Sequence, residues 1–227
     1  MGLGRMGNFH RRVLLDFGYK VETVDPDPDR EADHAGIPEG SYDVAAVACP
    51  PSALAACADR LRGTPMLVEK PFAWSAFEAR LLARALAPTP VCIGFVERFN
   101  PPVLRLKDEL ERRMEQGSFP RSVQFTRYSD RPSWDIGRDL LLHDLDLAHY
   151  LGVDEVAQYD TRVEQPEMRR RITAFFGERP LFADLLQHDQ SPLHGLWHAF
   201  LSGREHQTPA DAILALSRLE QLYRSAA

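Results

Sequence analysis

Cysteine is scarce in this sequence, and long apolar runs are absent from it. Its 227 residues include three cysteines, Cys49, Cys57 and Cys92, which form no Cys-x-x-Cys pair and lack the spacing of a metal site. A sparse, odd set of cysteines is typical of a reducing compartment. No stretch approaches the roughly 20 apolar residues that span a bilayer, and the N-terminus carries no apolar signal core. We therefore expect a cytoplasmic protein with no membrane partner.

Positive charge is also in short supply. The chain has 27 Lys and Arg residues against 33 Asp and Glu, which gives a net charge of -6. A general nucleic-acid binder needs a basic face, so we do not expect nucleic acid as a partner. With 44% hydrophobic residues, the chain can bury the core of one large or two small domains.

Residues 1–99 alternate short apolar runs with amphipathic stretches. The runs predict strands at residues 19–24, 43–48, 66–68 and 91–95, and the amphipathic stretches predict helices at residues 52–61 and 74–87. Such alternation is typical of a parallel sheet with helices on both faces. We expect an α/β fold in which residues 1–99 form a Rossmann-like domain that binds a dinucleotide.

The pattern changes after Asn100. Charged amphipathic stretches predict helices at residues 101–116, 136–151, 192–201 and 210–225, and apolar runs predict strands at residues 122–128, 171–176 and 181–186. Strands and helices no longer alternate regularly. Residues 100–227 are therefore expected to form a second, α+β domain with an antiparallel sheet.

A glycine loop opens the chain, with Gly2, Gly4 and Gly7 in a G-x-G-x-x-G pattern that also contains Arg5 and Met6. The first glycine permits a tight turn, the second lets the backbone approach a pyrophosphate, and the third lets helix pack closely on strand. A helix that starts here offers free N–H groups and partial positive charge to phosphates. The pattern predicts a dinucleotide site.

Asp25 follows the predicted strand at residues 19–24 and lies where an acidic residue holds the ribose hydroxyls of a dinucleotide, about 20 residues beyond the loop. Together with Asp27, it would repel a 2′-phosphate. We therefore expect NAD in preference to NADP. Alternatively, Asp25 is only a turn residue in the Asp-Pro-Asp-Pro sequence that it begins.

One feature conflicts with a complete dinucleotide fold. Such a fold has a buried strand before the first glycine, and only Met1 precedes Gly2. We therefore expect the first strand to be missing from the domain, unless an apolar strand is encoded upstream. A missing central strand leaves backbone groups without partners, which is costly.

Three further segments, at residues 68–71, 94–101 and 139–146, resemble motifs of one enzyme family. They match its E-K-P motif, the end of its last nucleotide-domain strand and its D-x-x-x-H-D-x-D helix, in the same order and spacing. With the glycine loop, they make the chain resemble the glucose-fructose oxidoreductase and inositol dehydrogenase (Gfo/Idh/MocA) family. The resemblance implies NAD(P)-dependent hydride transfer to or from a CH–OH group of a sugar, cyclitol or sugar nucleotide.

The resemblance also implies a catalytic group consisting of Lys70, Asp139 and His143. Asp139 and His143 are four residues apart and are expected to share a helix face. A histidine suits the removal of a hydroxyl proton. A lysine charge steadies the developing alkoxide, and Asp139 would orient or charge-balance the pair. Without the other motifs, a helix histidine among acidic residues is more often structural.

The same motifs suggest which residues border the ligands. Glu69 is expected to shape the loop of Lys70 and to contribute to the cofactor site, which Cys49 and Pro50 should border. Arg98 and Asn100 lie where substrate is expected. Arg98 would hold a carboxylate or phosphate, or would instead be an ordinary salt-bridge partner.

In the family that the chain resembles, the sheet of the second domain carries the subunit interface. Here residues 153–168 leave room for little strand, so we expect a shortened sheet. A homodimer through this sheet is the oligomer that the resemblance suggests.

Two other functions compete with this hypothesis. His143, Asp144, Asp146 and His149 suggest a metal-dependent hydrolase, but His143 and Asp144 point in different directions from a helix and do not easily share one ion. We therefore expect no metal site. The second alternative is a non-catalytic relative that binds a nucleotide or a partner. The missing strand favours it, and the intact catalytic motifs oppose it.

Overall fold

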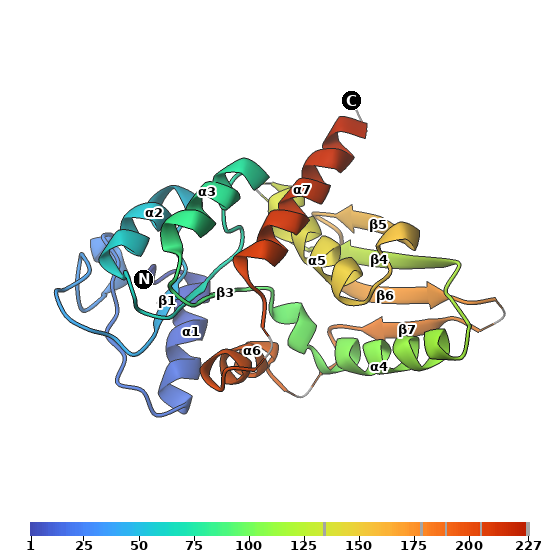
Figure 1. The fold of residues 1–227 in the computed structure, drawn as a ribbon, viewed down its shortest axis with the longest axis horizontal. Helices are drawn as coiled ribbons and strands as arrows, with labels where there is room; N and C mark the ends of the chain where they lie inside the picture. The colour runs from blue at the N-terminus through green and yellow to red at the C-terminus, as the bar shows by residue number, and fades with distance from the viewer. Residues whose placement is uncertain (134, 178, 189, 205, 226–227) are drawn as a thin grey trace. The chain divides into compact units, whose positions relative to one another are not determined.

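The protein is described by a computed structural model covering residues 1–133, 135–177, 179–188, 190–204 and 206–225. It divides into two compact units (Figure 1). Unit 1 comprises Met1–Gly94 and Leu196–Leu214, and unit 2 comprises Phe95–Gly195 and the residues from Ala215 onward. The expected α/β fold class is confirmed, because each unit combines helices with its own sheet. Unit 1 includes residues 196–214, which a simple division after Phe99 assigns to the second domain.

Unit 1 is built on a parallel sheet of three strands in the order β1-β2-β3. The strands are β1 (Ala45–Val47), β2 (Met66–Val68) and β3 (Val91–Ile93). Every residue of β2 and β3 is buried, as expected for a parallel sheet covered on both faces. The last residues of the three strands are in register, so the strands end together at one edge.

Helices cover both faces of this sheet. They are α1 (Arg5–Asp16), α2 (Pro51–Arg60) and α3 (Ala76–Leu86), with a short 3-10 turn η1 (Pro28–Arg30). Figure 1 shows α2 and α3 on one side of the sheet and α1 on the other. Ser75 caps α3 by accepting a hydrogen bond from the backbone nitrogen of Glu78.

The second stretch of unit 1, Leu196–Leu214, returns to the sheet and lies beside its edge strand β3. It contains the end of α6 (Pro192–Leu201) and the start of α7 (Pro209–Ser225). The backbone nitrogen of Ile93 donates to the carbonyl of Gln207 at 2.9 Å, and Gln207 is buried. This hydrogen bond explains why residues near the C-terminus belong to the N-terminal unit.

The strand predicted at residues 19–24 is wrong in extent. Only Val24 takes part in a bridge, an isolated parallel one with His34. On its other side, the carbonyl of Val24 accepts a hydrogen bond of 2.9 Å from the nitrogen of Gly2. Residues 19–23 form no ladder because no strand runs along their length in the part of the chain that the structure describes.

Residues 1–3 lie between Val24 and β1. The amino group of Met1 donates to the carbonyl of Ala46, and the carbonyl of Met1 accepts from the nitrogen of Ala48. A cavity of about 110 Å³ adjoins these residues. Its lining includes Val21, Glu22, Val44 and Ala45. The cavity thus lies beside the start of β1 and beside the residues that lead up to Val24.

Unit 2 contains a sheet of four strands in the order β5-β4-β6-β7. These are β4 (Ser122–Tyr128), β5 (Ala157–Arg162), β6 (Arg169–Phe175) and β7 (Leu181–Asp184). The prediction of an antiparallel sheet is wrong for one pair, because β4 and β5 are parallel. The helical segment between them returns the chain to the starting end, which is the connection that a parallel pair requires.

The expectation that residues 153–168 hold little strand is also wrong. They contain the 3-10 turn η4 (Asp154–Val156) and the six-residue strand β5. The polar sequence of β5 has only partly buried and exposed positions and lacks a clear apolar alternation. Its pairing with β4, rather than its own pattern, makes it a strand.

Two helices of unit 2, α4 (Pro101–Glu115) and α5 (Leu142–Tyr150), pack a core on one face of the sheet. The 3-10 turn η2 (Val96–Phe99) precedes α4, and the π-helical turn η3 (Gly137–Leu141) precedes α5. Alternate residues of β4 are buried. The core includes Val103, Leu106, Leu110, Val123, Phe125, Leu147, Ile172 and Ala183. None of the helices in the described ranges is both long enough and apolar enough to cross a membrane.

Candidate functional site

The carboxyl edge of the unit 1 sheet gathers most of the predicted cofactor residues. Cys49 and Pro50 follow β1, Glu69 and Lys70 follow β2, and Gly94 follows β3. Since the three strands end in register, the loops that follow them start from one edge. In open parallel sheets, ligands bind outside this edge.

Two of the three loop glycines are required by packing. Gly2 has φ +77°, and a Cβ atom on it would lie 2.7 Å from the carbonyl oxygen of Ala48. A Cβ atom on Gly7 would lie 1.8 Å from the carbonyl oxygen of Gly2. The loop therefore folds tightly against both β1 and the first turn of α1, and neither position admits a side chain.

Gly4 differs, because a Cβ atom there would meet nothing within 4 Å. It is the N-cap of α1 and provides no side chain to cap the N–H groups of the first turn, which includes Arg5, Met6 and Gly7. These N–H groups and the helix dipole favour an anion. Open space above a bare helix N-terminus at this edge fits the pyrophosphate of a dinucleotide.

Asp25 lies beside this loop. One of its carboxylate oxygens accepts from the nitrogen of Leu3 at 2.6 Å, and the other accepts from the nitrogen of Asp27 at 2.9 Å. Hydrogen bonds from the backbone N–H groups of Asp27 and Leu3 lower the pKa of Asp25, so it is a carboxylate at neutral pH. Asp25 is thus both a turn residue and a negative charge next to the glycine loop.

Cys49 pairs with a second cysteine. Its Sγ lies 3.7 Å from the Sγ of Cys57 on α2, and both are free thiols. The hydrogen bond with Cys49 lowers the pKa of Cys57 to about 7. The side chain of Cys49 therefore faces α2, and it is the backbone after β1 that borders the edge.

Glu69 lies at the centre of a buried polar chain that the sequence did not reveal. Its Oε1 is 2.9 Å from Nε2 of His10, and Nδ1 of His10 accepts from the indole nitrogen of Trp197 at 3.0 Å. The other carboxylate oxygen accepts from the backbone nitrogen of Lys70 at 3.2 Å. A Cβ atom on Gly94 would lie 2.9 Å from Glu69, so glycine leaves room for this carboxylate.

His10 could have been singled out from its position. It lies three residues beyond Gly7, on the same face of α1 as the buried Val13 and Leu14. A histidine on a buried helix face requires polar partners. Trp197 is 187 residues away, and nothing in the local pattern links the two.

In unit 2, the predicted Asp139–His143 pair spans a change of helix type. Asp139 lies in the π-helical turn η3, and its carboxylate accepts from the hydroxyl of Ser133 at 3.0 Å. His143 lies in the first turn of α5 and is half-buried, with its ring 6.2 Å from that of Phe95. Short π-helical turns are frequent at functional sites.

Arg98 and Asn100 are bound inside unit 2. Arg98 is buried, and its Nε donates to Asp146 on α5 at 2.9 Å, with a second bond from its guanidinium to the same carboxylate. The side-chain nitrogen of Asn100 donates to Glu97 and to the carbonyl of Leu185. The geometry supports the salt-bridge interpretation of Arg98.

Asp144 on α5 is held by another buried arginine. Arg127 on β4 donates to both oxygens of Asp144 and also to Glu97. Burial raises the pKa of Asp144 despite this partner. Burial also raises the pKa of Glu97, but the charges of Arg127 and Arg170 outweigh it and hold the value below its usual range. Arg127 through Asp144 and Arg98 through Asp146 thus hold α5, the helix that carries His143.

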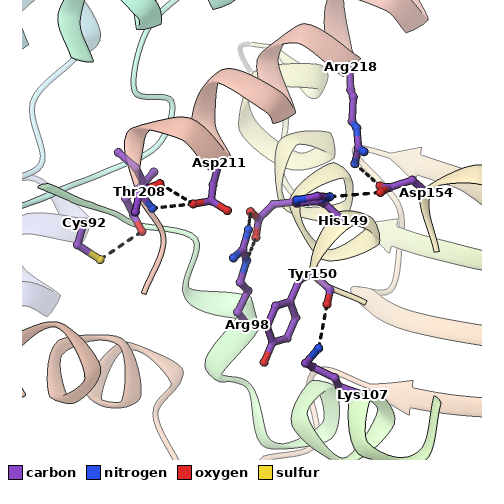
Figure 2. A network of polar contacts seen from close by, with 11 residues as sticks. Cys92, Arg98, Lys107, His149, Tyr150, Asp154, Thr208, Asp211 and Arg218 are labelled. Atoms are coloured by element: carbon purple, nitrogen blue, oxygen red, sulfur yellow. Dashed lines mark hydrogen bonds and ion pairs between the residues drawn. The ribbon is translucent and has the colours of Figure 1, made fainter. Parts of the chain in front are cut away.

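The cluster proposed for a metal hydrolase does not form. Asp144 and Asp146 are bound to arginines, and His149 is exposed, with Nδ1 3.3 Å from Asp154. Figure 2 shows His149 beside Asp154, which also binds Arg218. Among the residues with described positions, no three His, Cys, Asp or Glu side chains are arranged to hold a metal ion.

Unit 1 is thus built on a Rossmann-like parallel sheet with a glycine loop, and unit 2 contains a mixed sheet. Neither the protein-family models nor the curated proteins include a match to this sequence. Solved structures do match it. The UDP-N-acetylglucosamine 3-dehydrogenase GnnA from Acidithiobacillus ferrooxidans is 21% identical, with a TM-score of 0.79 over 97% of this chain and 94% of that chain.

Two further structures have the same architecture. GenD2 from gentamicin A biosynthesis, in complex with NAD, is 20% identical, with a TM-score of 0.82 over 99% of this chain and 92% of that one. A myo-inositol dehydrogenase from Corynebacterium glutamicum is 17% identical, with a TM-score of 0.76 over 99% and 94%. The resemblance to Gfo/Idh/MocA-type dehydrogenases is therefore confirmed at the level of the fold.

Proposed function

We propose that the protein is an NAD-dependent oxidoreductase that transfers a hydride between NAD and a CH–OH group of a sugar, cyclitol or sugar nucleotide. The observation that carries the proposal is the glycine loop. Gly4 is open above the uncapped N-terminus of α1, with the Asp25 carboxylate beside the same loop. Helix N-termini of this kind favour a pyrophosphate, and a carboxylate can accept hydrogen bonds from ribose hydroxyls.

In this proposal, different residues of unit 1 bind different groups of the nucleotide. The N–H groups around Gly4, Arg5 and Met6 would bind the pyrophosphate, and Asp25 would bind the ribose and disfavour a 2′-phosphate. The backbone of Cys49 and Pro50 and the loop of Glu69 and Lys70 would border the nucleotide along the carboxyl edge. NAD in the bound state supplies the hydride acceptor.

The reaction requires the chain to manage one proton and one developing charge. When the hydride leaves the alcohol carbon, the hydroxyl proton passes to the imidazole of His143 as general base. The ammonium group of Lys70 stabilises the alkoxide that forms. Asp139 orients His143 or balances its charge. The proposal requires these three residues to act on one substrate.

The substrate class is supported by proteins of the same fold. One of them is a UDP-N-acetylglucosamine 3-dehydrogenase and another is a myo-inositol dehydrogenase. Because the sequence identities are 21% and 17%, the likeness extends to the fold and the substrate class stays a proposal. We place the enzyme in the cytoplasm, which suits its free thiols.

A homodimer through the sheet of unit 2 belongs to the same proposal. The strands of this sheet alternate buried residues with less buried ones, and Phe182 on β7 is 67% exposed. A homodimer through this face would cover the exposed ring of Phe182. Light scattering tests it: we expect twice the chain mass, and Phe182→Asp should halve that value.

The alternative is a relative that binds a nucleotide or a partner without turnover. One experiment separates the two functions. NAD and NADP are titrated by calorimetry, and NADH formation is followed with a panel of sugars, cyclitols and sugar nucleotides. NAD binding with NADH formation supports the enzyme. NAD binding without turnover of any substrate supports the nucleotide-binding alternative. Absence of nucleotide binding rejects the enzyme and leaves only a relative that binds a partner.

A further inference from the structure

A buried polar chain crosses unit 1 from α6 to the loop that carries Lys70. Trp197 on α6 and His10 on α1 are both 0% exposed, and Glu69 is 8% exposed. Trp197 donates to His10 at 3.0 Å, and His10 meets Glu69 at 2.9 Å. Three segments that are distant in sequence therefore share one hydrogen-bonded path.

The directions of these two hydrogen bonds determine which ring nitrogen of His10 carries the proton. An indole nitrogen only donates, so Nδ1 of His10 must accept from Trp197. Nε2 then carries the proton and donates it to the carboxylate of Glu69. His10 is thus held as one neutral tautomer, with both ring nitrogens in use. The edge-on arrangement of the two rings, at 81° and 5.8 Å, is consistent with this bond.

Glu69 connects His10 to the backbone of Lys70. Its Oε1 faces His10, while its Oε2 accepts from the backbone nitrogen of Lys70. Gly94 lies against the same carboxylate and leaves room for it, since a Cβ atom there would lie 2.9 Å from Oε1 of Glu69. The position of the Lys70 backbone is therefore coupled to the ring of His10.

We propose that His10 and Trp197 are positioning residues for Lys70, acting through the carboxylate of Glu69. The proposal rests on the proposed function of Lys70 as the charge that stabilises the alkoxide. A buried network that is fully hydrogen-bonded is rigid, and loss of one member leaves its neighbours unsatisfied. Small displacements of a group at a reacting centre cost about 100-fold in rate.

The chain offers a direct reporter of this coupling, because its only lysines are Lys20, Lys70 and Lys107. Reductive methylation with ¹³C-formaldehyde gives one dimethyl-lysine signal for each, plus one for the amino terminus. We expect Trp197→Phe, which removes the donor but keeps an aromatic ring, to shift the Lys70 signal. The signals of Lys20 and Lys107 should stay in place and serve as internal controls.

Kinetics provide a second readout, which a merely structural role would not move. Trp197→Phe should lower kcat about 10- to 100-fold and leave the Kd for NAD within about twofold. His10→Leu should lower kcat further. His10→Gln, which keeps an N–H donor for Glu69, should recover part of the loss.

Two matched controls test whether the effect belongs to the network. Trp74→Phe makes the same change at a tryptophan that is 38% exposed. His198→Gln changes an exposed histidine next to Trp197 on α6. Both should match the wild type in the Lys70 signal and in kcat.

The tautomer of His10 is measured on the wild-type protein by ¹⁵N NMR, so this test does not depend on whether a variant folds. A protonated Nδ1 overturns the proposal. Wild-type Lys70 signals and kcat in folded Trp197→Phe and His10→Leu variants also overturn it. If the wild type turns over no substrate but the Lys70 signal still moves in Trp197→Phe, the positioning stands and the proposed function fails.

Discussion

The carboxylate of Asp25 accepts a hydrogen bond from the backbone nitrogen of Leu3, inside the glycine loop, at a distance of 2.6 Å. This bond ties the end of one segment of unit 1 to the turn before α1. It also places a negative charge next to the position proposed for the nucleotide. Asp25 therefore has two effects, one on nucleotide choice and one on the stability of the loop.

The first prediction concerns nucleotide choice. Asp25→Ala removes the proposed acceptor for the ribose hydroxyls and the charge that opposes a 2′-phosphate. We expect NAD to bind more weakly and the preference over NADP to narrow, both measured by calorimetry. Asp33→Ala is the control, because its carboxylate binds Thr23 rather than the loop. Tighter binding of NADP than of NAD by the wild type would contradict the prediction.

The second prediction concerns pH. Hydrogen bonds from Asp27 and Leu3 lower the pKa of Asp25 in the folded protein. Because the pKa of Asp25 is lower in the folded than in the unfolded protein, its ionisation stabilises the fold at pH values above the unfolded pKa of about 3.9. This stability is lost as the pH falls through the pKa of the folded protein. Asp25→Asn should therefore have a lower Tm than the wild type at pH 7. The difference in Tm between the wild type and Asp25→Asn should shrink as the pH falls below about 4. A difference that stays constant with pH would refute this prediction.

The third prediction separates two glycines of the loop. A Cβ atom on Gly4 meets nothing within 4 Å, whereas one on Gly7 meets the carbonyl oxygen of Gly2. Gly4→Ala should keep the wild-type Tm and weaken NAD binding, because the methyl group occupies the approach of the pyrophosphate. Gly7→Ala should lower the Tm. Thermal melts and calorimetry on both variants check this, and unchanged NAD affinity in Gly4→Ala argues against a pyrophosphate there.

The fourth prediction compares two histidines of α5. His143→Ala should lower kcat by roughly 10²–10⁴ and keep NAD affinity within a few-fold. His149→Ala should be nearly silent, because His149 is exposed and binds Asp154. In the wild type, oxidation should speed up as the pH rises and the imidazole of His143 becomes neutral. Equal damage from both substitutions would mean that the wrong helix face has been chosen.

The fifth prediction concerns stability of unit 2. Arg127→Met leaves the buried carboxylates of Asp144 and Glu97 without their main partner, and we expect it to lower the free energy of unfolding by about 3–5 kcal/mol. Arg127→Met combined with Asp144→Leu should lose less, since one buried charge is removed with the other. The exposed Arg112→Met should leave the free energy of unfolding close to that of the wild type, because surface ion pairs contribute little. Urea denaturation measures all three variants.

Much of unit 1 could be predicted because its signals are local. The apolar runs of β2 and β3 and the Pro and Ser residues at the starts of α2 and α3 are read within a few positions. The predicted strand at residues 19–24 failed for a non-local reason. A strand exists only where a neighbour pairs with it, and only Val24 has such a neighbour.

The candidate site divides in the same way. The glycine loop was evident from residue types alone, because glycine is required where backbone approaches backbone. The Lys70 segment was suggested by its resemblance to a family motif. The partners of Arg98 were left open as ligand or salt bridge, since a sequence does not show that Asp146 lies within reach. The bond from Trp197 to His10 was missed for the same reason.

The sequence by itself therefore determined the α/β class, the alternation of elements in unit 1 and the residues around which a site can form. These depend on periodicity, on glycine geometry and on residue chemistry, all of which act over short stretches. The tertiary structure alone decided that β4 and β5 are parallel, that residues 196–214 join unit 1 and that His10 supports Glu69. Such pairings bring together residues far apart in the chain, and they are selected by the burial and hydrogen bonding of the whole fold.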